Sequence, residues 1–151
     1  MKDLFKNKAL GFYMGLAAAA IAVIGSVLYL ALDVSDRTFT WLSFALMLAG
    51  GLVWIACFIV LPILKLDEKL PWVEILAPLV CTLLYVMGFA FTLNAALPSL
   101  SDVWNNVNFI GGNAAMGVAF SAVFLVAAAA GIVECFLAHS KKASASVKEE
   151  A

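Results

Sequence analysis

Four long apolar runs, separated by short polar segments, dominate the chain. A helix needs about 20 apolar residues to cross the roughly 30 Å hydrocarbon core of a bilayer, and each run is long enough. Backbone groups in lipid must form hydrogen bonds within the protein, which favours helices over separate strands. The pattern therefore predicts four transmembrane helices, over residues 9–32, 40–64, 72–97 and 113–138.

The composition excludes a water-soluble domain. Of the 151 residues, 65% are hydrophobic and 13% are charged, whereas an average globular chain has about 45–50% and about 25%. Disorder of the whole chain is excluded because disordered chains are poor in apolar residues. A net charge of −1 provides no basic surface for nucleic acid. We expect an all-α membrane protein, a four-transmembrane-helix bundle of up-down-up-down topology, over residues 1–139, with a disordered tail at 140–151.

The basic residues predict the orientation of the bundle. Of the nine Lys and Arg residues, only Arg37 flanks the ends of the helices that face away from the termini. The positive-inside rule then places both termini in the cytoplasm of a multi-pass cell-membrane protein. The first apolar run exceeds the roughly 7–15 residues of a signal peptide core, so we expect it to remain as a span. The basic residues on the cytoplasmic side are Lys2, Lys6, Lys8, Lys65, Lys69, Lys141, Lys142 and Lys148.

Small residues recur along the predicted helices at spacings of three and four, most regularly from Gly11 to Gly25. Lipid tails are as apolar as Leu, so helices in a bilayer associate where small residues permit close approach. The three cysteines, Cys57, Cys81 and Cys135, fall on such seams, which favours packing over a metal-binding or nucleophilic role. The glycines expected at helix contacts are Gly11, Gly15, Gly25, Gly50, Gly88, Gly117 and Gly131.

The sequence offers little catalytic chemistry. It has no His-Glu-x-x-His, Gly-x-Ser-x-Gly, phosphate-loop or Cys-x-x-Cys motif. Its single histidine, His139, follows the fourth span, and we expect an interfacial residue without an acidic partner at mid-membrane. We therefore expect no enzymatic activity, no metal and no cofactor.

Intramembrane ionisable residues usually indicate transport or a proton relay. The candidates here are Glu74 and Glu134, and both lie near the basic ends of their helices. One interpretation is ion pairing at the interface, and the other is a half-site that binds a cation or a headgroup. Small multidrug exporters also have four spans, but they need a Glu deep in the first helix, which this chain lacks.

The segment 98–113, on the side away from the termini, combines Asn amides, one carboxylate and two aromatic rings. It suits a site that binds a sugar, a peptide or a headgroup. It equally suits a loop folded over the helix ends, with a Trp in the interfacial aromatic belt. Asn113 is expected to cap the fourth helix. The candidate ligand-binding residues are Asp102, Trp104, Asn105, Asn108 and Asn113, with Glu134 near the opposite exit.

Two stretches suggest a comparison with known architectures. The basic start Lys6-Asn7-Lys8 leads into Gly11-Phe12-Tyr13, and an Asn/Gly-rich link precedes a final helix rich in Ala and Val. In these features the chain resembles uncharacterised small four-span membrane proteins of bacteria. The resemblance covers the architecture of most of the chain. It implies a bacterial inner membrane, and it carries no activity and no site residues.

Two functions fit the sequence. The leading hypothesis is a non-enzymatic integral membrane protein that acts through helix packing, as an accessory subunit of a membrane complex or as a homo-oligomer. The alternative is a component that binds or transports a small solute or a lipid through the polar, aromatic segment described above. The expected partners are the lipid bilayer and either another membrane protein or a second copy, without nucleic acid.

Overall fold

The computed structural model describes residues 8–63, 72–108, 110–137 and 139. The predicted tail at 140–151 lies outside these residues. So do all the basic residues of the predicted cytoplasmic side except Lys8. The described elements are α2 (Leu10–Asp33), α3 (Trp41–Ile55), the π-helical η1 (Ala56–Val60), α4 (Leu61–Ile63), α5 (Val73–Trp104) and α6 (Ala114–Cys135).

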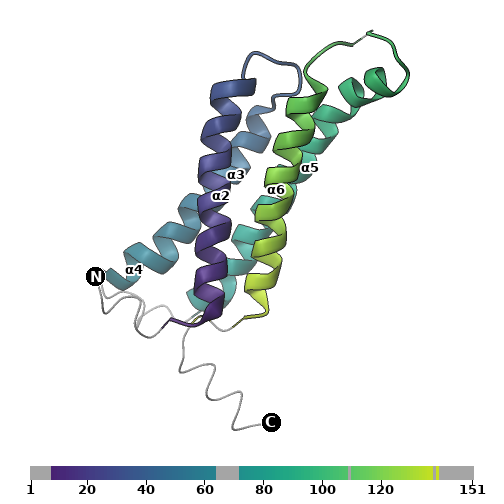
Figure 1. Ribbon diagram of the computed structural model, residues 1–151. Helices are drawn as coiled ribbons and strands as arrows, with labels where there is room; N and C mark the ends of the chain where they lie inside the picture. Colours follow the sequence, from purple (N-terminus) through teal and green to yellow (C-terminus); the bar gives the residue numbers. More distant parts are fainter. Residues whose placement is uncertain (1–7, 64–71, 109, 138, 140–151) are drawn as a thin grey trace.

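The elements form a four-helix bundle (Figure 1). α3, η1 and α4 continue one another as a single span, Trp41–Ile63, and all four spans are long and apolar enough to cross a membrane. α2 packs on α3 and α6, and α5 packs on the same two helices. Short connections make consecutive helices antiparallel neighbours. The predicted all-α bundle of up-down-up-down topology is confirmed, and the chain has the character of a multi-pass membrane protein.

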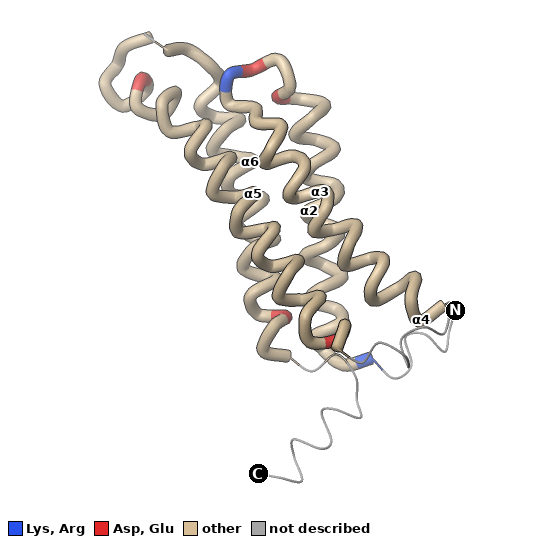
Figure 2. Tube along the Cα trace, turned by 180° about the vertical axis from the view of Figure 1, so that it is seen from behind, with Lys and Arg blue, Asp and Glu red and all other residues tan. Residues whose placement is uncertain are grey.

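The charged residues of the described part of the chain gather at the two ends of the bundle (Figure 2). Lys8 precedes α2 and Glu74 lies in the first turn of α5, and we call this end of the bundle the Lys8 end. Asp33 ends α2 and is followed by Asp36 in the connection to α3, and we call that end the Asp36 end. The long apolar stretch between the two ends is what the interior of a bilayer requires.

The end of α5 differs from the prediction. The apolar run indicated an end at Leu97, before Pro98, but the helix continues through Pro98 to Trp104. Pro98 removes one backbone donor from the helix, and its ring is exposed, but the helix continues for another six residues. α5 thus has 32 residues, whereas the other spans have 22 to 24, and its last turns project past the bundle (Figure 1).

Glycines lie where a large side chain of the neighbouring helix packs against the helix backbone. All seven glycines expected at helix contacts are buried. A Cβ atom at Gly50 would lie 2.6 Å from Tyr85 Cε1, and one at Gly88 would lie 2.6 Å from Met47 Cγ. Both distances are shorter than carbon atoms can approach. α3 and α5 therefore sit close together because each accommodates a bulky side chain of the other against a glycine.

The substitution Gly50→Val should destabilise the bundle, because the new side chain would collide with the Tyr85 ring. Overpacking of this kind costs roughly 1–3 kcal/mol. The matched control is Ala49→Val, which adds similar bulk at an exposed position of the same helix. Thermal unfolding in detergent should show a lower Tm for Gly50→Val alone. Equal Tm values for the two variants would contradict this packing.

Candidate functional site

A carboxylate is fully buried near the Lys8 end. Glu134, in the last turn of α6, is 0% exposed. Its Oε1 accepts a hydrogen bond from Trp54 Nε1 at 2.6 Å and lies 2.9 Å from His139 Nε2. Its Oε2 is buried and has no hydrogen-bond partner in the described part of the chain. A buried carboxylate without donors is very unfavourable, so Trp54 and His139 are what make this position tolerable.

His139 folds back beneath the bundle. Its ring stacks on Phe58 of η1, with centroids 4.9 Å apart and planes 15° apart. Its carbonyl accepts the N–H of Ala9 at 3.0 Å, just before α2 begins. The partner of His139 is thus not an acidic residue at mid-membrane but Glu134, in the last turn of α6, and the sequence did not predict this contact. The chain turns back after α6, and this turn brings the imidazole to Glu134.

Gly15 of α2 provides the space for this pair. A Cβ atom at Gly15 would lie within 3.0 Å of both Glu134 Oε1 and Trp54 Nε1. Trp54 and Phe58 are four residues apart, so they share one helix face, and their rings stack at 5.1 Å. We call Gly15, Trp54, Glu134 and His139 the Glu134 node. It joins α2, α3, α6 and the segment after α6.

A second polar cluster closes the Asp36 end. The Asp36 carboxylate accepts the backbone N–H of Asn113 at 3.1 and 3.0 Å and the N–H of Thr38 at 3.0 Å. Arg37 Nη1 donates to the carbonyl of Ile110 at 2.9 Å. These bonds hold the connection between α5 and α6 against the connection between α2 and α3.

The electrostatics of Asp36 follow from these donors. The Thr38 N–H holds the pKa of Asp36 below its ordinary value, with the Asn113 N–H acting in the same direction and burial opposing them. A negative charge is therefore retained at this end of the bundle, where it anchors backbone rather than lining an open site.

The predicted ligand-binding residues are not brought to one point. Asp102 is buried, and its Oδ2 accepts the N–H groups of Ile110 at 2.6 Å and Gly111 at 3.0 Å. Glu134 lies at the opposite end of the bundle, in the last turn of α6. Asp102 therefore holds the backbone of its own loop, and the arrangement favours a loop folded over the helix ends.

The other members of the predicted set have separate roles. Asn113 accepts the N–H of Met116 at 3.1 Å, which confirms it as the cap of α6. The amide of Asn105 donates to the carbonyl of Ser101 at 2.9 Å. Trp104 is 88% exposed, and Asn108 is exposed as well. Ligand binding at this loop stays a prediction, and Trp104 and Asn108 are its most accessible members.

Comparisons of the chain with protein-family models, with curated proteins and with solved structures found no match. One carboxylate, one imidazole and one indole meet at a single oxygen atom, and among the described residues no group of three or more metal-ligating side chains is assembled. This arrangement is suited to tying helices together inside a membrane.

The substitution Gly15→Ala should destabilise the protein, although Ala is ordinarily the better helix former by about 1 kcal/mol. The added methyl group would push Glu134 Oε1 away from its donor Trp54. The control is Gly25→Ala in the same helix, where the nearest side-chain atoms would be 3.1 Å away. Thermal unfolding in detergent should give a lower Tm for Gly15→Ala than for Gly25→Ala. The reverse order would refute the role of Gly15.

The polar cluster at the Asp36 end should loosen in acid. Because the pKa of Asp36 is lowered in the fold, its contribution is present above the ordinary pKa of Asp, about 3.9, and is lost as pH falls through the lowered value. Amide hydrogen exchange should report faster opening at the Thr38 and Asn113 N–H groups in that range, after correction for intrinsic rates. In Asp36→Asn this extra acid-dependent opening should vanish, and its persistence would assign the effect to another group.

Proposed function

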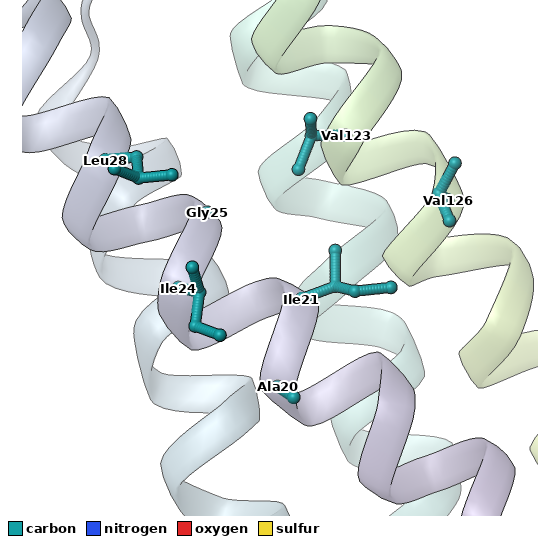
Figure 3. Close-up of a pocket in the computed structure, with 7 residues that line it drawn as sticks. All are labelled: Ala20, Ile21, Ile24, Gly25, Leu28, Val123 and Val126. Atoms are coloured by element: carbon teal, nitrogen blue, oxygen red, sulfur yellow. The ribbon is translucent and has the colours of Figure 1, made fainter.

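We propose that the protein is a non-enzymatic membrane component that acts through helix packing, and that it self-associates through the outer face of α2 and α6. A groove of about 420 Å³ runs along this face (Figure 3). We call it the α2/α6 groove. It is lined only by apolar residues: Ala20, Ile21, Ile24, Gly25, Leu28, Val123 and Val126.

Gly25 lines the groove at the point where α2 and α6 come close together. A Cβ atom there would lie 3.1 Å from Val123 Cγ1 and from Phe124 Cε1, so the α2 backbone approaches α6 closely at this point. Ile21 reaches across towards α6 below the gap (Figure 3). A surface of this kind, with a small residue at its floor, is typical of contacts between helices in membranes.

This face combines a groove with exposed apolar side chains along its rims, and this combination supports the proposal. Ile24 and Leu28 form one rim and are 59% and 47% exposed, and Val126 on the other rim is 54% exposed. In a two-fold symmetric contact the same patch occurs on both partners. The Ile24–Leu28 ridge of each copy can then enter the groove of the other. A helix of another membrane protein could occupy the same groove. Because the groove and the ridge that fits it lie on the same face, a second copy of this chain is the favoured occupant.

The interior of the bundle supports a packing role over conduction. Ser43 and Thr92, buried between α3 and α5, bond to each other and to the carbonyl of Gly88. Ser26 and Ser121 donate to carbonyls of their own helices. These four hydroxyl groups bond to each other or to backbone carbonyls instead of lining a polar path across the membrane.

We further propose that the Lys8 end faces the cytoplasm of a bacterial cell, in the inner membrane. The support is the sequence: Arg37 is the single basic residue on the other side, and basic residues accumulate on the cytoplasmic side. The bacterial setting rests on the resemblance to small four-span proteins.

Filling the groove should weaken self-association. The variant Ala20→Trp places an indole on the groove wall at an exposed position, whereas Ala45→Trp adds the same group to an exposed position of α3. Overpacking of roughly 1–3 kcal/mol corresponds to a loss of about 5- to 150-fold in affinity. Energy transfer between differently labelled copies in lipid vesicles, followed as lipid is added, should show this loss for Ala20→Trp alone.

A wild-type protein that stays monomeric at every protein-to-lipid ratio would overturn the proposed self-association. Equal weakening by Ala20→Trp and Ala45→Trp would show that copies meet through another face.

A further inference from the structure

The second half of the α3 span diverges from α5 towards the Lys8 end. In both views α4 lies well apart from the start of α5 (Figures 1 and 2). The α-helical hydrogen bonding of this span widens to the π-helical η1, and Pro62 follows, whose ring would collide with the carbonyl of Phe58 in a regular helix. Such π-helical turns are frequent at functional sites. The divergence opens the bundle towards lipid on this side.

An apolar groove of about 310 Å³ occupies the opening. We call it the α3/α5 groove. One wall comes from the α3 span and the other from the first turns of α5, where Leu76 and Val80 are each 48% exposed. Its lining includes Val53, Cys57, Leu61, Leu76 and Val80. A groove of this composition, reached from the lipid side, suits a hydrocarbon chain.

A smaller cavity, of about 30 Å³, adjoins the groove and is charged. It shares Cys57, Leu61 and Val73 with the groove, and its other lining residues include Lys8 and Glu74. Lys8 Nζ lies 4.9 Å from the centroid of the Phe12 ring. Within the described residues no Lys or Arg forms a salt bridge, and the carboxylate of Glu134 contacts His139 instead. Lys8 and Glu74 therefore face this cavity without pairing with each other. One cation and one anion therefore border the same small space.

We propose that the α3/α5 groove, together with Lys8 and the exposed Glu74 at its edge, forms one binding site for a zwitterionic phospholipid with a primary-amine headgroup. An acyl chain lies in the groove. The phosphate accepts hydrogen bonds from Lys8 Nζ, and the ammonium group donates to the Glu74 carboxylate. The complementarity of the two charges to a zwitterion, directly beside a tail-sized groove, identifies the occupant.

Trp72 completes the site. It lines the groove just before α5 begins and is 55% exposed. Tryptophan is enriched at the depth of lipid headgroups, because its ring is apolar and its N–H seeks water or headgroup oxygen. This places the boundary between tail and headgroup where the apolar groove meets the charged cavity.

The site is independent of the proposed self-association. It lies between α3 and α5, whereas the α2/α6 groove lies on another face of the bundle. A protein that binds lipid but stays monomeric would overturn only the self-association, and a dimer without lipid preference would overturn only the lipid site.

The test is native mass spectrometry of the full chain, released from mild detergent, with phosphatidylethanolamine, phosphatidylcholine and phosphatidylglycerol of identical acyl chains. Phosphatidylethanolamine should bind about tenfold more tightly than the other two, because it alone offers ammonium N–H donors to Glu74. Equal affinity for the three lipids, or no retained lipid, would overturn the proposal.

Single substitutions test which residue contacts which part of the headgroup. Glu74→Gln should remove the preference for phosphatidylethanolamine over phosphatidylcholine, and Lys8→Gln should weaken all three lipids about tenfold. The matched control is Arg37→Gln, which removes an exposed cation at the opposite end and should leave lipid binding unchanged. Wild-type binding by both the Glu74 and Lys8 variants would overturn the headgroup assignment.

The groove is tested separately. Val80→Trp fills it from an exposed position and should weaken all three lipids while leaving the Tm unchanged. Glycerophosphoethanolamine, which has the headgroup but no acyl chains, should not compete at the same concentration. Competition as strong as that of the intact lipid would show that the groove takes no tail.

Discussion

A carboxylate buried at the end of a membrane bundle must be given hydrogen-bond donors, and meeting that requirement organises the Lys8 end of this protein. Glu134 accepts a hydrogen bond from Trp54 of α3 and contacts His139, which follows α6. Gly15 of α2 leaves the space that the Glu134 and Trp54 side chains occupy. Rotation of α3 or α6 by one residue would separate Trp54 from Glu134 and leave a buried carboxyl group without that donor. Hydrophobic matching with lipid supplies no comparable specificity.

The interior contacts of the bundle contrast with its outer surface. The interior is filled by aromatic rings set against small residues, and the polar loops at the Asp36 end bind one another's backbone. Two apolar grooves on the outside of the described bundle, one between α2 and α6 and one between α3 and α5, are large enough for a helix or a hydrocarbon chain. Both proposals therefore concern what the bundle contacts in the plane of the membrane.

The sequence predicted the four spans because an apolar run of bilayer length is a strong local signal, and it predicted the Asn113 cap because the bond to Met116 is also local. It predicted the wrong end for α5, because Pro98 indicated a helix boundary although the helix continues through it to Trp104. It did not predict the contact between His139 and Glu134, because no hydrophobic pattern in the sequence marks the turn after α6. The bond between Trp54 and Glu134 spans 80 residues of sequence, so no local pattern could reveal it.

A double-mutant cycle on Trp54 and Glu134 tests this tie most directly. The free energy of unfolding in detergent would be measured for the wild type, Trp54→Phe, Glu134→Met and the double variant, because neither Phe nor Met can form the hydrogen bond. A direct hydrogen bond between two buried side chains predicts a coupling above about 0.5 kcal/mol and up to about 3 kcal/mol between the two positions. Effects of the two substitutions that add to within about 0.5 kcal/mol would contradict a direct bond between α3 and α6 as the interaction that fixes the bundle.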